Sequence, residues 1–150
     1  MLQIGNAGLN QEEARTHFFA WAVAAAPLLM ATDLSGLDAG SLALLGAPEV
    51  VAVDQDPLGV QGVRVSPAAP SGCECWARPL ADGGVAALLV NRGGAPADAS
   101  CSFEELGLRQ PAAPAAARDL WLRRGLGNFS GSITAQQLPP HGSLLVKLVQ

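Results

Sequence analysis

The sequence has 150 residues, of which 49% are hydrophobic and 15% charged. This length suits one ordinary domain or two small pieces sharing a core, and the apolar content excludes a disordered tail. The net charge is −4 and the basic residues are scattered, so we expect neither nucleic acid nor a membrane surface as a partner.

Targeting, metal and cofactor signals are absent from the sequence pattern. The longest apolar run, residues 18–31, is interrupted by Pro27. It is too short for a bilayer, which needs about 20 residues, and indicates a buried helix followed by a strand. No charged and apolar leader follows Met1, so no signal peptide is expected in this chain. The histidines lie far from the cysteines, so we expect no metal site, and no motif indicates a cofactor.

The first 57 residues alternate between strand and helix patterns. Residues 2–5 predict a short strand. Asn10 and Glu13 then form a capping box before apolar residues at helical spacing, and Pro27 ends that helix. Residues 28–31 predict a second, fully buried strand.

A second helix is expected before residue 57. Asp38 caps it, and the helix runs through Leu45 and is closed by Gly46. Residues 50–53 fit either a strand or a final helical turn after Pro48. Alternating strands and helices imply a parallel sheet, yet two βα units cannot close a (β/α)8 barrel, which takes about 250 residues. Residues 1–57 therefore look like the end of a larger domain.

From residue 58 onward the helical period disappears. Short strand candidates follow, separated by Gly, Pro, Asn and Asp clusters, at 62–66, 73–80, 85–91, 99–103, 117–122, 133–138 and 143–149. This spacing predicts an antiparallel sandwich or barrel over residues 58–150. Residues 111–117 have low complexity and predict a surface loop.

Side-chain alternation assigns faces on the strand that begins at Cys73. Cys73 and Cys75 share one face, so at most one of them could form a disulfide with Cys101. Trp76 faces the other side, and we interpret it as packing between the two halves of the chain, with stacking on a sugar as the alternative. Asn128 begins an Asn-Phe-Ser sequon for N-glycosylation, expected in a Gly-rich loop.

Several motifs occur in a fixed order along the chain. They are Met-Leu-Gln-Ile-Gly-Asn at 1–6, the passage from Thr-His-Phe at 16–18 to Thr-Asp-Leu at 32–34, the segment at 49–62, and shorter stretches around Trp76, Asn91, Trp121 and His141. Together they resemble the α-galactosidases (melibiases, glycoside hydrolase family 27), in which Asn more often stands at position 54. The resemblance implies the last two βα units of a (β/α)8 barrel followed by an antiparallel β-sandwich domain.

The same resemblance implies an activity. Family members remove terminal α-linked galactose from oligosaccharides or glycoconjugates with retention, which needs two carboxylates about 5–5.5 Å apart. Both are aspartates on earlier barrel strands with no counterpart in this chain, so no catalytic residue is assigned and the chain alone is expected to be inactive. The resemblance also implies a secreted, vacuolar or lysosomal parent protein and leaves a homodimer open.

Two residues are candidates for substrate binding. The Met that corresponds to Met1 lines the galactose pocket in the family. Asp33 is the acid placed to reach the face at the carboxyl ends of the strands, with a structural role, bonding loop amides, as the alternative. His17 is interpreted as a hydrogen-bonded packing residue.

Two other functions stay open. One is an α-N-acetylgalactosaminidase of the same family, since the pocket for the 2-substituent is formed outside this chain. The other is a non-catalytic β-sandwich that binds sugars or a partner protein, with residues 1–57 as a helical cap.

Overall fold

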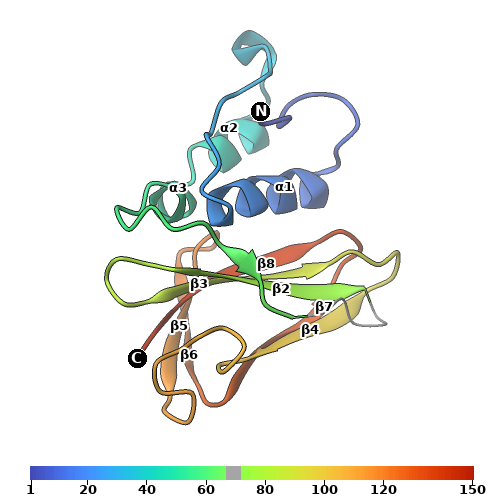
Figure 1. Cartoon of the computed structure of the whole chain (residues 1–150). Helices are drawn as coiled ribbons and strands as arrows, with labels where there is room; N and C mark the ends of the chain where they lie inside the picture. The colour runs from blue at the N-terminus through green and yellow to red at the C-terminus, as the bar shows by residue number, and fades with distance from the viewer. Residues whose placement is uncertain (67–71) are drawn as a thin grey trace.

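The helices of the chain lie in its first third and cover one face of a β-sandwich (Figure 1). The computed structural model describes residues 1–66 and 72–150. The helical elements are α1 (Gln11–Val23), η1 (Leu34–Gly36), α2 (Ala39–Leu45) and α3 (Pro48–Asp54).

The helix boundaries follow local capping chemistry. The predicted capping box is confirmed: the Asn10 side chain accepts from the Glu13 amide at 3.0 Å, and the Glu13 carboxylate accepts from the Asn10 amide at 2.9 Å. Asp38 caps α2 and Gly46 follows it, as predicted. The segment 50–53, left open by its sequence, is helical because Pro48 occupies the first turn of α3.

The two strands expected in this region are reduced to one parallel bridge between Leu2 and Met30. The Leu2 amide donates to the Leu29 carbonyl at 2.7 Å, and the Ala31 amide donates to the Leu2 carbonyl at 3.1 Å. The prediction of a fully buried strand at 28–31 is wrong, since Leu29 is 61% and Met30 46% exposed. A parallel strand is buried when it has neighbours on both sides, and within residues 1–66 and 72–150 these two segments pair only with each other.

The rest of the chain forms the predicted antiparallel sandwich. Its strands are β1 (Val63–Arg64), β2 (Cys73–Pro79), β3 (Val85–Asn91), β4 (Ala97–Ser102), β5 (Ala115–Asp119), β6 (Arg124–Phe129), β7 (Ser132–Leu138) and β8 (Ser143–Val149). Six of them make one sheet in the order β1-β2-β3-β8-β5-β6, and β4 pairs with β7 in the second.

Two expectations for this half need correction. Strand β6 was not predicted, and Asn128 lies in it, paired with Ala116, rather than in a loop. The surface loop expected at 111–117 ends early, because β5 begins at Ala115, and Ala115 and Ala117 are buried. Alanine has low strand propensity, so the pairing of β5 with β6 and β8 decides its conformation.

The six-stranded sheet separates two apolar cores. The inner core fills the sandwich and contains Phe103 and the disulfide between Cys75 and Cys101. The second core lies between the helices and the outer face of the sheet, and we call it the junction core; its most buried members include Phe19, Val50 and Leu145. Trp76 packs against the junction core, which confirms the packing interpretation of that residue.

Candidate functional site

The carboxyl ends of the two parallel segments meet at a tight turn. Gly5 has a φ of +87°, and a Cβ at that position would lie 2.1 Å from Cδ2 of Leu37. Only glycine satisfies both conditions. Asn6 then joins the two segments, since its amide donates to the Ala31 carbonyl at 3.2 Å and its carbonyl oxygen accepts from the Thr32 hydroxyl at 2.6 Å. The loops at this end are therefore fixed to each other.

Asp33 follows the second of these segments and caps η1. Its carboxylate accepts from the Ser35 amide at 2.9 Å and the Ser35 hydroxyl at 2.7 Å. These two hydrogen bonds hold the pKa of the Asp33 carboxyl below its ordinary value. The geometry is that of a carboxylate bonding its own loop, while its contact with a substrate stays a prediction.

Met1 lies beside the bridge formed by Leu2 and Met30. Met1 is 64% exposed, so this residue, which was expected to line a substrate pocket, is not covered by other described residues. Among the described residues, the loops at this end carry Asp33 and also Asp38, whose carboxylate caps α2 by accepting from the Ser41 amide at 2.9 Å. Within this same part of the chain no group of three or more His, Cys, Asp and Glu side chains could hold a metal ion.

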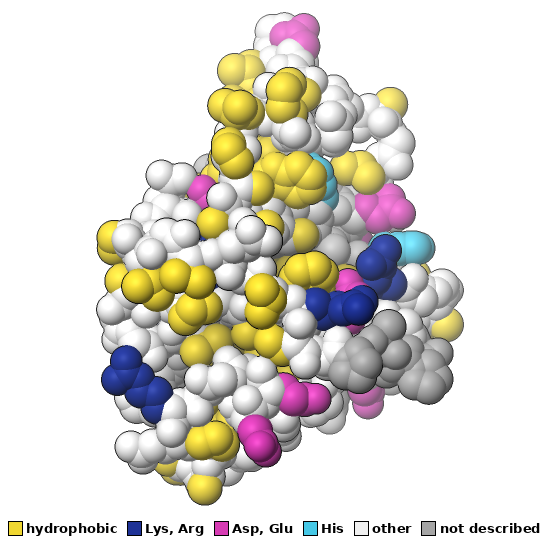
Figure 2. Space-filling view, in the orientation of Figure 1, with side chains coloured by type: hydrophobic (Ala, Val, Ile, Leu, Met, Phe, Trp, Pro, Cys, Tyr) yellow, Lys and Arg dark blue, Asp and Glu magenta, His cyan; other side chains and the backbone are white. Residues whose placement is uncertain are grey.

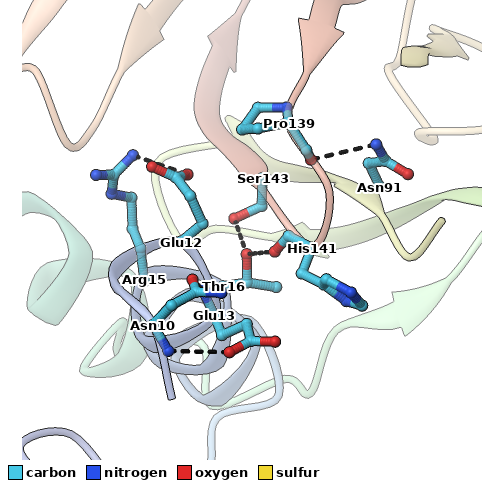
Figure 3. Close-up of polar contacts among 9 residues, drawn as sticks. All are labelled: Asn10, Glu12, Glu13, Arg15, Thr16, Asn91, Pro139, His141 and Ser143. Atoms are coloured by element: carbon cyan, nitrogen blue, oxygen red, sulfur yellow. Dashed lines mark hydrogen bonds and ion pairs between the residues drawn. The ribbon is translucent and has the colours of Figure 1, made fainter. Parts of the chain in front are cut away.

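Helix α1, which leads away from these loops, is attached to the sandwich by polar contacts. The Thr16 hydroxyl lies 2.7 Å from the His141 carbonyl and 2.8 Å from the Ser143 hydroxyl (Figure 3). The ring of His17 packs against Trp21 in a tilted arrangement, with centroids 4.3 Å apart, and its Nε2 accepts from the Gln3 amide. His17 is thus a hydrogen-bonded packing residue, as its apolar helix predicts.

Arg78 is a buried residue of the junction that sequence reasoning missed. It is 1% exposed, and its guanidinium donates to the Ala22 carbonyl at 2.6 Å and to the Asp54 carbonyl at 3.2 Å. It therefore neutralises the carboxyl ends of α1 and α3 at once. Its position two residues after Trp76 could have indicated this, because a charge on an otherwise apolar face needs a buried partner.

The remaining predicted site is Asn128, whose side chain is exposed on the edge strand β6. No helix among the described residues is long and apolar enough to cross a membrane.

Comparison with known proteins identifies the class. Residues 70–148 match the alpha galactosidase C-terminal beta sandwich domain, and residues 1–56 match the family described as alpha galactosidase A. These matches define a glycoside hydrolase class in which helices and strands precede a β-sandwich. The chain belongs to the α-galactosidase (melibiase) family.

Individual relatives agree with this assignment. The chain is 42% identical over 136 residues to an α-galactosidase of Cyamopsis tetragonoloba, covering 91% of this chain and 32% of that protein. It is 34% identical over 153 residues to human alpha-galactosidase A, covering 99% and 35%. The crystal structure of α-galactosidase I from Mortierella vinacea superposes with a TM-score of 0.92 at 29% identity, covering 100% of this chain and 38% of that one. The chain thus spans about a third of the length of these relatives.

Proposed function

We propose that the chain is part of a retaining glycoside hydrolase that removes terminal α-linked galactose from oligosaccharides or glycoconjugates. The observation that carries this proposal is the joint match of both halves of the chain to α-galactosidase families. Relatives that cover most of the chain are named α-galactosidases.

We further propose that residues 1–57 are the last two βα units of a (β/α)8 barrel and that residues 58–150 are its C-terminal sandwich domain. The parallel bridge between Leu2 and Met30 supports this, because each segment offers an outer edge on which further parallel strands can pair. The exposed side chains of Met1, Leu29 and Met30 would be covered by those strands.

On this proposal the 150 residues alone do not turn over substrate. Retention needs a nucleophile and an acid/base carboxyl about 5–5.5 Å apart. Asp33 and Asp38 at the carboxyl-end loops accept hydrogen bonds from Ser35 and Ser41, which lower the pKa of both carboxyls and leave them poorly suited to protonate a leaving group.

The test compares two proteins on a synthetic aryl α-galactoside. One is the 150-residue chain, and the other carries this chain fused behind the preceding barrel region of the Cyamopsis tetragonoloba relative. We expect hydrolysis with retention from the fusion and none from the chain. Turnover by the chain alone would refute the assignment of catalysis to residues outside it, and a folded but inactive fusion would refute the hydrolase proposal.

A second candidate activity is supported by one relative. Human alpha-N-acetylgalactosaminidase is 44% identical over 82 residues, covering 55% of this chain. The fusion with the plant barrel cannot separate the two activities, because its substrate pocket comes from the relative. The assay that separates them uses this chain behind its own upstream sequence and compares the aryl α-galactoside with the aryl α-N-acetylgalactosaminide.

We also propose passage through an oxidising compartment, as expected for a secreted, vacuolar or lysosomal protein. The disulfide between Cys75 and Cys101 and the exposed sequon at Asn128 support this. Expression through a secretory route should give a glycan that Asn128→Gln removes, seen as a loss of mass.

A further inference from the structure

A cleft of about 450 Å³ opens between α1 and the outer face of β2 and β3. Figure 2 shows charged and imidazole side chains gathered between the helical layer and the sandwich, where this cleft lies. Its floor is apolar and includes Trp76, Leu88 and Val90, while polar groups line its rim. This volume lies within the range of about 300–1,000 Å³ that is typical of small-molecule sites.

The walls of the cleft are fixed before any ligand arrives. Thr16 on α1 holds the turn before β8 through the His141 carbonyl and the Ser143 hydroxyl (Figure 3). Asn91, fully buried, donates to the carbonyls of Ala95, Leu138 and Pro139. Binding therefore needs little ordering of the protein, which favours affinity for a small ligand.

His141 stands out on the rim. Its φ is +59°, a conformation in which glycine is the usual residue. Its imidazole lines the cleft and points away from the Thr16 hydroxyl in Figure 3. Its backbone carbonyl, and not its ring, accepts the hydrogen bond from Thr16, and the residue is exposed on the rim. Because His141 is exposed and lines the cleft, its ring is accessible to a ligand that enters there.

The charges of the cleft balance one another. Glu74 is 4% exposed and accepts from the Trp76 indole at 3.1 Å. The guanidinium groups of Arg64 and Arg92 lie 3.4 and 3.5 Å from the same carboxylate. Burial lowers the pKa of the His17 imidazole, which disfavours its charged form. The cleft thus presents many donors without excess charge.

The second acid on the rim is also engaged. The carboxylate of Glu13 accepts from the Asn10 amide in the capping box, so its charge serves the amino end of α1. An ionic ligand would have to displace these internal partners. A neutral ligand with several hydroxyl groups would not.

We propose that this cleft binds a neutral sugar ring. Its C–H face lies against the apolar floor at Trp76, and its hydroxyls bond to the imidazole of His141 and to the free guanidinium donors of Arg92. The site lies at the junction of helices and sandwich, and the residues named here line it. The choice of galactosides as probes rests on the proposed function, while the cleft itself does not.

The test is an NMR titration of the 150-residue chain with methyl α-galactoside, methyl β-galactoside and, separately, sodium sulfate. We expect saturable shifts with a millimolar dissociation constant for at least one glycoside, centred on the Trp76 indole N–H. The indole signal of Trp121, which is not among the residues that line the cleft, serves as the internal reference.

The matched variants exploit backbone conformation. His141→Gly removes the imidazole but suits the positive φ, so it should keep the fold and weaken binding at least fivefold. Arg123→Gly makes the same kind of change at a φ of +53° outside the cleft and should leave binding unchanged.

Other outcomes would overturn the proposal. Absence of shifts with both glycosides shows that the cleft binds no sugar, and equal affinity in His141→Gly shows that the sugar does not bond to His141 as proposed. Shifts with sulfate alone make it an anion site, and shifts that depend on protein concentration make it a contact between copies. None of these results bears on the hydrolase activity of the longer protein, which is measured on the fusion.

Discussion

Replacing Arg78 by methionine should loosen the attachment of the helices to the sandwich. Methionine fills most of the same volume, so the change removes charge and hydrogen bonds without opening a large cavity. The carbonyls of Ala22 and Asp54 then lose a donor in a buried place, since Arg78 is 1% exposed.

The size of the effect follows from these contacts. Each hydrogen bond to a charged group contributes about 1.5–3 kcal/mol, and the guanidinium makes two of them, to the carbonyls of Ala22 and Asp54. We expect the free energy of unfolding to fall by about 3–5 kcal/mol, a large part of the roughly 5–15 kcal/mol of a typical domain.

Asp54 adds a pH dependence to this loss. Burial already raises the pKa of its carboxyl, and the neighbouring Arg78 charge opposes that rise. Without Arg78 the folded state holds the Asp54 proton more tightly than the unfolded state does. The free energy of unfolding of the variant therefore rises as pH falls through the raised pKa of Asp54. The difference in stability between the variant and the parent protein becomes smaller as pH approaches 3.8, the ordinary pKa of the carboxyl.

Urea unfolding followed by tryptophan fluorescence measures both effects. Arg124→Met, on the exposed edge of β6, is the control and should change the unfolding free energy by less than about 0.5 kcal/mol. If Arg78→Met unfolds like the control at pH 7, the two carbonyl contacts do not hold the junction. If the stability loss caused by Arg78→Met stays constant down to pH 4, the Asp54 carboxyl does not contribute to it.

Local signals in the sequence predicted much of the fold. The capping box at Asn10 and Glu13 and the Asp38 cap of α2 depend on residues three apart, so neighbours decide them. Strands β3 and β8 coincide with the predicted ranges because continuous apolar runs end at polar turns.

Features decided by distant partners were not predictable in the same way. Strand β6 contains Gly125 and Gly127, which have low strand propensity, and it forms by pairing with β5. Residues 28–31 match the pattern of a buried strand, but a strand is buried only when other strands lie on both sides of it. Among the described residues this segment pairs only with the segment at Leu2. The alternation of side chains along β2 predicts which face of the sheet Arg78 occupies. It does not predict the partners of Arg78, which lie 24 and 56 residues away in sequence.

Two further predictions test the carboxyl-end loops and the junction. Gly5→Ala should destabilise the chain by more than the roughly 1–3 kcal/mol of a positive φ, because its Cβ also meets Leu37. Gly8→Ala, at a φ of +108° with open space around it, isolates the conformational part; equal losses in the two variants by thermal unfolding would refute the steric argument. At the junction, Glu49 on α3 accepts two hydrogen bonds from Arg118 on β5, at 2.8 and 2.6 Å. These hydrogen bonds lower the pKa of the Glu49 carboxyl. Its contribution to stability is present above the ordinary value of 4.5 and is lost as pH falls through the lowered pKa. A double-mutant cycle of Glu49→Gln and Arg118→Gln should therefore show coupling at pH 7 that disappears in acid and weakens in high salt, because half-exposed ion pairs are screened. Coupling that persists at low pH would mean that the two side chains stabilise the junction by packing, and not through charge.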